Sequence, residues 1–202
     1  METEFSSREK DKIYKGMRKK YKQAAKKPDG LFKYPTGKAG LEALQYEAEI
    51  IMALPETVVA SYCGVGNPFT LGAINEGESI LDIGCGAGVD TIFAAKMTGP
   101  TGKVVGIDLM PEMLLRAKEN LALANLDNVT YEESSAEILS FPDENFDVVI
   151  SNGALNLVPD KAKALSEVFR VLKSGGRLMI ADQILIGESP KGRKQIIESW
   201  SQ

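Results

Sequence analysis

The stretch Ser79-Ile80-Leu81-Asp82-Ile83-Gly84-Cys85-Gly86-Ala87-Gly88 decides the fold. Residues 79–83 are a short apolar run typical of a buried strand, and residues 90–97 predict a helix. Between them the chain must turn sharply and let its backbone approach a ligand, which glycine permits at low cost. Open parallel sheets bind ligands at the carboxyl ends of their strands. The stretch therefore predicts a strand, a glycine loop and a helix that together form a ligand site.

Short apolar runs and helical patterns alternate along the rest of the chain. Strands are expected at residues 103–107, 129–132, 146–151 and 177–184, and helices at 111–126 and 161–172, the second helix being closed by residues 174–176. Such alternation is typical of a parallel α/β sheet. Because four of the five strands are largely apolar, we expect helices to bury both faces of the sheet.

The segment before residue 79 has a different character. Helices are expected at residues 8–27, 40–54 and 70–74. In the first of them Tyr14, Met17 and Tyr21 recur at spacings of three and four, which predicts a helix face packed on a body. We therefore expect an N-terminal helical cap over residues 1–60 and a ligand-binding domain over residues 61–202.

The chain contains no histidine and only two cysteines, Cys63 and Cys85. The lack of histidine removes the commonest general base and metal ligand, so Ser-His-Asp and Cys-His mechanisms are excluded. Two cysteines without zinc-site spacing predict neither a disulfide framework nor a metal site. The chemistry must need little proton transfer, or use Asp, Glu, Tyr or the substrate itself.

The net charge of −4 conceals an asymmetry, because residues 1–33 hold 11 Lys/Arg against 5 Asp/Glu. Such a basic helix could attract nucleic acid, but a solvated amphipathic helix is the favoured interpretation. The sequence shows no pattern of aromatic residues that would stack on bases, so nucleic acid is disfavoured as a partner. The apolar runs are too short to span a bilayer, and the N-terminus is not a secretory signal. We expect a cytoplasmic protein with no membrane partner.

Asp108 lies 20 residues past Gly88, at the end of the second expected strand. A carboxylate at this point can accept hydrogen bonds from both hydroxyls of a ribose. Val89 occupies the place of the last glycine in the dinucleotide pattern G-x-G-x-x-G, which favours a nucleoside without phosphates. A P-loop is excluded because G-K-[ST] is absent. The sequence therefore predicts a nucleoside site.

Four motifs together resemble those of class I S-adenosylmethionine (SAM)-dependent methyltransferases. They lie at residues 82–88 (DIGCGAG), 106–108 (GID), 146–152 (FDVVISN) and 172–178 (LKSGGRL). The resemblance implies a Rossmann-like, doubly wound α/β fold with a mostly parallel sheet of strand order 3-2-1-4-5. The family adds two further strands that this sequence lacks. A tail helix, a partner chain or a homodimer contact would then cover the sheet edge, or the chain is truncated.

Four more segments are similar to those of arsenite methyltransferases. They are residues 64–68 (GVGNP), 99–103 (GPTGK), 110–113 (MPEM) and 151–161 (SNGALNLVPDK). Members of that family carry one cysteine before G-N-P and another after S-N, where this chain has Val65 and Gly153. Thiolates suit a soft arsenic centre. The acceptor is therefore left open between arsenite and another small molecule.

The resemblance implies SAM as the cofactor and assigns its binding residues. Asp108 would hold the ribose, Leu109 and Met110 would flank the adenine, and Asn152 would face the methionine moiety. The expected set is completed by Ser135, Ala136 and Glu137 at the adenine edge, and by Asp82, Gly84, Cys85, Gly86 and Gly88 in and before the glycine loop.

The expected reaction is an in-line displacement in which the cofactor supplies the activated methyl group and the protein aligns the reactants. This suits a chain without histidine. No catalytic base is assigned, and Tyr62, Cys63 and Asn67 are expected on the substrate side. The favoured function is methyl transfer to a small-molecule or metalloid acceptor. A SAM-binding module without turnover is one alternative, and an NAD-dependent oxidoreductase is another, which Val89 disfavours.

Overall fold

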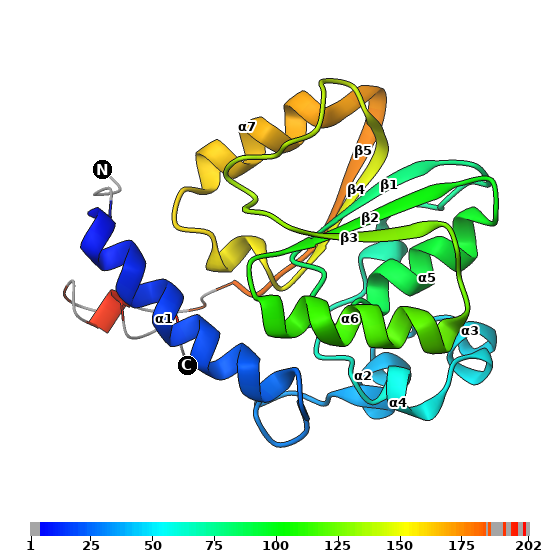
Figure 1. Cartoon of the computed structure of the whole chain (residues 1–202), viewed down its shortest axis with the longest axis horizontal. Helices are drawn as coiled ribbons and strands as arrows, with labels where there is room; N and C mark the ends of the chain where they lie inside the picture. Colours follow the sequence, from blue (N-terminus) through cyan, green and yellow to red (C-terminus); the bar gives the residue numbers. More distant parts are fainter. Residues whose placement is uncertain (1–4, 185, 187–191, 193–194, 198–199, 201–202) are drawn as a thin grey trace.

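The computed structural model describes residues 5–184, 186, 192, 195–197 and 200. Its centre is a five-stranded sheet of order β3-β2-β1-β4-β5 in which the strands pair in parallel (Figure 1). The strands are β1 (Ser79–Ile83), β2 (Lys103–Asp108), β3 (Val129–Glu133), β4 (Phe146–Asn152) and β5 (Leu172–Ala181). The first four begin at the predicted residues, and the predicted strand order is confirmed.

Helices cover both faces of the sheet, as the apolar strands predict. Helices α5 (Val89–Thr98) and α6 (Pro111–Ala124) lie on one face, and α7 (Lys161–Val171) lies on the other (Figure 1). Successive side chains of a strand point to opposite faces. Accordingly Ile80 packs in the cluster with α5 and α6, whereas Leu81 packs in the cluster with α7. Burying one such side chain stabilises the fold by about 1.5–3 kcal/mol.

Helix α1 (Ser7–Ala24) crosses the side of the sheet where the strands end (Figure 1). The spacing of its apolar residues gives it one buried face, on which Ile13 and Met17 are almost fully covered. This face packs against Met110 and Met113 at the beginning of α6. The predicted packing of the first helix on a body is therefore confirmed.

A single helix over residues 40–54 was the wrong prediction. The segment between α1 and β1, residues 25–78, is called the cap from here on. It contains α2 (Gly37–Ala43), α3 (Ala48–Ala53), α4 (Glu56–Val59) and the 3₁₀ helix η1 (Pro68–Leu71). Gln45 adopts a φ of +58°, and the amide of Tyr46 donates to the carbonyl of Leu41 at 3.0 Å. The chain therefore turns between α2 and α3, and Tyr46 enters a core cluster with Tyr62 of the cap and Phe93 of α5. The domain boundary at residue 60 stays a prediction.

Strand β5 differs from the expected residues 177–184, because it begins at Leu172 and ends at Ala181. Leu172 pairs with Phe146, and a register shift follows before the regular pairing with β4 resumes. Helix α7 accordingly ends at Val171, and Gly175 lies within β5 with a φ of +79°. The expectation that residues 174–176 close the helix was therefore wrong. The expected tail helix lies mostly outside the described residues, of which 195–197 are helical.

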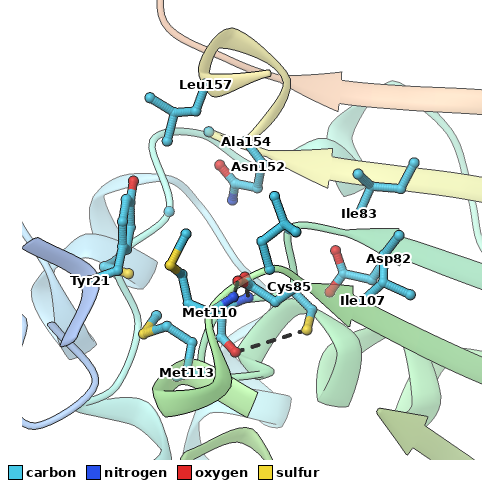
Figure 2. Close-up of a pocket in the computed structure, with 18 of the residues that line it drawn as sticks. Tyr21, Asp82, Ile83, Cys85, Ile107, Met110, Met113, Asn152, Ala154 and Leu157 are labelled. Atoms are coloured by element: carbon cyan, nitrogen blue, oxygen red, sulfur yellow. Dashed lines mark hydrogen bonds between the residues drawn. The ribbon is translucent and has the colours of Figure 1, made fainter. Parts of the chain in front are cut away.

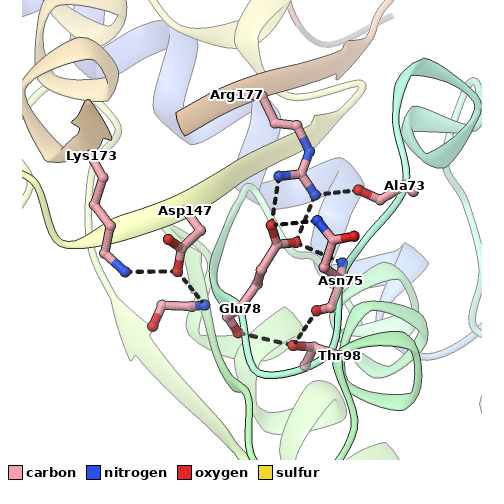
Figure 3. Close-up of polar contacts among 8 residues, drawn as sticks. Ala73, Asn75, Glu78, Thr98, Asp147, Lys173 and Arg177 are labelled. Atoms are coloured by element: carbon pink, nitrogen blue, oxygen red, sulfur yellow. Dashed lines mark hydrogen bonds and ion pairs between the residues drawn. The ribbon is translucent and has the colours of Figure 1, made fainter. Parts of the chain in front are cut away.

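Ion pairs connect the opposite end of the sheet, where β1 begins. The guanidinium of Arg177 donates to both carboxylate oxygens of Glu78, at 2.8 and 2.6 Å (Figure 3). The ammonium of Lys173 donates to Asp147 at 2.7 Å. The bonds from Arg177 lower the pKa of Glu78 to about 2. These contacts join the start of β1 to β4 and β5, at the end of the sheet opposite the carboxyl ends of the strands.

Within the described ranges, no helix combines the length and apolar character needed to cross a membrane. The same residues contain no group of three or more His, Cys, Asp or Glu side chains placed to hold a metal ion.

Candidate cofactor and acceptor site

A pocket lies at the carboxyl ends of β1, β2 and β4, and α1 forms its outer wall. Figure 2 shows Tyr21 of α1 on one side and Asp82 of β1 on the opposite side. The lining also includes residues 134–136 after β3 and residues 61–64 of the cap. This is the edge at which open parallel sheets bind ligands, as the sequence predicts.

The glycine loop after β1 is bonded to β2, because the amide of Gly84 donates to the carbonyl of Ile107 at 2.8 Å. Gly84, Gly86 and Gly88 have φ values of +71°, +52° and +78°. L-residues rarely adopt such values. A Cβ on Gly84 would in addition overlap the side chain of Ala154. The loop therefore requires glycine, and its bare backbone lines the pocket.

Asp108 ends β2 beside this loop. Its Oδ2 accepts a hydrogen bond from the amide of Gly86 at 2.9 Å, and its Oδ1 accepts one from the amide of Met110 at 2.8 Å. Burial raises the pKa of Asp108, while these amide bonds oppose the rise. Because each carboxylate oxygen can accept two hydrogen bonds, both can still accept a hydroxyl from a ligand. The site thus fits the ribose of a nucleoside.

Ten of the twelve predicted cofactor residues line the pocket; Gly88 and Glu137 do not. A Cβ on Gly88 would overlap the hydroxyl of Tyr131, so this glycine permits close packing of α5 on β3. Glu137 accepts a hydrogen bond from the amide of Asp160 at 2.9 Å, at the start of α7, and lies 3.9 Å from Lys10. The binding roles of all twelve stay predictions.

Two further carboxylates face the pocket near the glycine loop. Thr91 donates from its hydroxyl to Asp82 at 2.6 Å, yet burial and the charge of Asp90 raise the pKa of Asp82 to about 8. Burial also raises the pKa of Asp90 to about 6, although hydrogen bonds from Tyr46 and Asn152 lower it in part. With Asp108, these groups make the inner wall acidic, which suits a cationic ligand.

The outer wall is aromatic and polarisable. Tyr14, Met17 and Tyr21 of α1 face the pocket together with Tyr34 and Cys63 of the following cap. Burial and, next, the charge of Asp108 raise the pKa of Cys63 to about 12, so its thiol stays protonated near neutral pH. Protonated thiols are poor nucleophiles. This wall can therefore shape an acceptor but offers it no ready base.

The three residues expected on the substrate side have different surroundings. Cys63 lines the pocket, and so does Tyr62, whose hydroxyl donates to the carbonyl of Gly66 at 2.8 Å. Asn67 is not among the residues that line it. Its Oδ1 instead accepts from the amide of Phe69 at 3.0 Å and caps η1. Asn67 therefore shapes the cap, in contrast to the expectation.

Sequence reasoning missed two residues beside the pocket, Tyr46 and Asp90. The hydroxyl of Tyr46 donates to Asp90 at 2.6 Å, and the side-chain amide of Asn152 donates to the other oxygen of Asp90 at 2.9 Å. The only signal for Asp90 is a carboxylate two residues past the last glycine of the loop. No local pattern marks Tyr46, because the partners of its hydroxyl lie between 16 and 106 residues away.

Val65 and Gly153, which stand where arsenite methyltransferases carry cysteines, are neighbours in space. A Cβ built on Gly153 would lie 3.1 Å from a methyl carbon of Val65. Gly153 has a φ of +68° and lines the pocket. The two positions thus form one apolar contact beside the end of β4, with no thiol in it.

The fold and the site define a Rossmann-like α/β protein whose pocket, at the ends of β1 and β2, fits a nucleoside. Residues 74–202, more than half of the chain, match the family described as "Methyltransferase domain". The chain therefore belongs to this family of SAM-dependent methyltransferases, and SAM is its cofactor. This confirms the resemblance seen in the motifs.

Relatives and a solved structure agree with this assignment. An arsenite methyltransferase of Halobacterium salinarum is 37% identical over 155 residues, which are 77% of this chain and 39% of that protein. The ubiquinone/menaquinone biosynthesis C-methyltransferase UbiE of Pasteurella multocida is 41% identical over 110 residues, which are 54% of this chain and 41% of that protein. The crystal structure of CrArsM, an arsenic(III) SAM methyltransferase from Chlamydomonas reinhardtii, has a TM-score of 0.56 and 34% identity, covering 74% of this chain and 50% of that one. The chain thus spans less than half the length of these two curated relatives.

Proposed function

We propose that this chain transfers the methyl group of SAM to a small-molecule or metalloid acceptor held between α1 and the glycine loop. The observation that carries the proposal is the position of Asp108, whose carboxylate is fixed by the amides of Gly86 and Met110 at the edge of the pocket. This carboxylate and the bare loop beside it form a complementary surface for an adenosine with a positively charged substituent.

Bound SAM supplies a methyl group activated on a sulfonium centre. Asp108 would accept hydrogen bonds from its ribose hydroxyls, and Leu109 and Met110 would enclose its adenine together with Ser135 and Ala136. The glycine loop would follow the methionine part as far as the acidic wall. The raised pKa values near this wall indicate a carboxylate environment that gains stability from a bound cation.

The chain's own residues would orient the reactants and exclude water. Tyr14, Met17 and Tyr21 cover the pocket from the side of α1. Burial raises the pKa of Tyr21 far above its usual range, so its hydroxyl is no base at neutral pH. Because Cys63 is protonated as well, the acceptor must bring its own lone pair, as thiolates, amines and trivalent arsenic do.

Arsenite is the second candidate acceptor, favoured by the identity with an arsenite methyltransferase and with CrArsM. The apolar contact between Val65 and Gly153 argues for a different acceptor, because it occupies the place of two thiols that would bind arsenic. The relative UbiE is named a C-methyltransferase, so the relatives of this chain are not all named for arsenite as the acceptor.

Two measurements test the proposal. Calorimetric titration should give binding of S-adenosylhomocysteine (SAH) and none of NAD; binding of NAD alone would overturn it. Transfer of labelled methyl groups should then be measured with arsenite and with a panel of thiols, amines and phenols. Turnover with an organic acceptor and not with arsenite is the expected result, whereas SAH binding without any turnover would favour a SAM-binding module.

A small-molecule substrate is supported by membership of the methyltransferase family and by a pocket enclosed between α1 and the strand ends. A homodimer and a cytoplasmic location stay predictions. Sedimentation of the purified chain, with and without SAH, would test the first of them.

A further inference from the structure

The side chain of Asn152, at the end of β4, is bonded through both ends of its amide. Its Oδ1 accepts hydrogen bonds from the amides of Val65 and Gly66, at 2.8 and 3.1 Å. Its Nδ2 donates to the carbonyl of Gly66 at 2.7 Å and to the carboxylate of Asp90 at 2.9 Å. An asparagine is the residue that supplies an acceptor and two donors in this geometry.

The other members of this cluster come from separate parts of the cap. Tyr46 follows α2, Tyr62 follows α4, and the hydroxyl of Tyr62 lies 3.2 Å from that of Tyr46. Tyr46, Tyr62 and Asp90 are each less than 9% exposed. Asp90 is anchored in the first turn of α5, directly after the glycine loop. The cluster therefore joins the cap to the two elements that frame the pocket.

The fit around Asn152 is close. A Cβ on Gly64 would overlap the side-chain amide of Asn152, so the backbone of the cap lies against it without space to spare. Cys63 and Gly64, which line the pocket, are carried by the segment that Asn152 holds. The segment lies at the β4 side of the pocket, whereas Asp108 lies across β1 at the β2 side.

We propose that Asn152 is a positioning residue that holds residues 63–66 of the cap over the methionine half of the cofactor site, with Asp90 and Tyr46 as its fixed partners. This proposal rests on the proposed function. The two sites would then have separate effects. Asp108 would determine binding of the adenosine half of the cofactor, and the Asn152 cluster would determine closure over the methionine half. A loss of the cluster should weaken ligands that carry the amino-acid chain and spare those that lack it.

Asn152→Asp is the sharpest variant. It keeps the shape and the bonds accepted from the amides of Val65 and Gly66, but it loses the donor to the carbonyl of Gly66 and sets one carboxylate against another at Asp90. Asn152→Asp combined with Asp90→Asn exchanges the two groups and restores a donor facing an acceptor. Tyr46→Phe removes one donor to Asp90 and serves if the first variant does not fold. Asn128→Asp is the matched control, since Asn128 is bonded to the carbonyls of Ala95 and Gly99 and does not line the pocket.

The probes are SAH and 5′-methylthioadenosine, which lacks the amino-acid chain, titrated calorimetrically into each folded variant. We expect Asn152→Asp to weaken SAH by at least about tenfold, as loss of charge-assisted bonds implies, with methylthioadenosine changed by less than about twofold. The exchanged double variant should recover part of the SAH binding, because it restores the bond between residues 90 and 152 but not the one to the carbonyl of Gly66. Tyr46→Phe should show a smaller loss of the same kind. The control should lose stability without this difference between the ligands.

Equal weakening of both ligands, or no recovery in the double variant, would overturn the positioning role. If the unaltered chain bound neither ligand, the proposed function itself would fail, and this outcome is distinct from the preceding ones.

Discussion

Asp82 and Asp90 face one end of the pocket. Burial, and next the charge of Asp90, raise the pKa of Asp82 to about 8. The pKa of Asp90 itself is raised to about 6. Both carboxyl groups are more readily protonated in the folded chain than in the unfolded one, so their contribution to stability is present at low pH and is lost as the pH rises through these values. Above these pH values the two ionised carboxylates repel each other, and a bound cation would relieve that repulsion.

The preference for SAM over SAH should therefore depend on pH. SAM carries a sulfonium charge that SAH lacks, and both share the same ammonium and carboxylate. As Asp90 and Asp82 ionise between about pH 5 and about pH 8, the ratio of SAM to SAH affinity should rise by about tenfold. Calorimetry of both ligands across this range measures the ratio. Asp82→Asn should flatten the upper part of the curve, and a ratio that falls with pH would contradict the account.

Gly84→Ala should abolish cofactor binding and lower the free energy of unfolding. The new Cβ would overlap Ala154, and the φ of +71° adds backbone strain. Gly175→Ala is the matched control, because Gly175 has a φ of +79° but no atom within 4 Å of its Cβ position. The control should lose about 1–2 kcal/mol from strain alone, and Gly84→Ala should lose more. Chemical denaturation of both variants measures the difference, and equal losses would show that the loop is not tightly enclosed.

Arg177→Ala should destabilise the chain without changing SAH affinity, since the pair with Glu78 lies at the far end of the sheet from the pocket (Figure 3). The expected loss is about 1–3 kcal/mol. The pKa of Glu78 is lowered to about 2 in the folded chain. Its contribution to stability is therefore present above the ordinary pKa of a glutamate and is lost as the pH falls toward 2. Denaturation at pH 7 and at pH 3 should therefore show a larger difference between variant and parent at pH 7. A weaker SAH affinity in a fully folded variant would contradict this assignment.

The sheet and the position of Asp108 beside the glycine loop could be predicted because both are encoded locally. Strands β1, β2 and β4 are apolar runs between turn residues, and Asp108 stands at a fixed spacing from the glycine loop. The break near Gln45 could not be predicted, since no glycine or proline marks it. The turn places Tyr46 where its hydroxyl bonds to Asp90 and Asn152. The contact with Asn152 spans 106 residues of sequence and therefore leaves no periodic pattern.

Strand β5 shows the same limit. The motif at residues 172–178 predicted a turn before the strand, yet Leu172 already pairs with Phe146 and the irregular register absorbs the extra residues. Similarly, the sequence placed Asn152 at the cofactor, but its side-chain bonds to Val65 and Gly66 depend on the cap lying over β4. Residues that join separate segments become visible only in the folded chain.

The central claim is that the carboxylate of Asp108 grips the ribose of an adenosine cofactor. Titration of SAH into Asp108→Ala, with folding verified by circular dichroism, tests it most directly. Because two charge-assisted hydrogen bonds would be lost, the affinity should fall by about 100-fold. An Asp108→Ala variant that binds SAH as tightly as the parent would contradict the account.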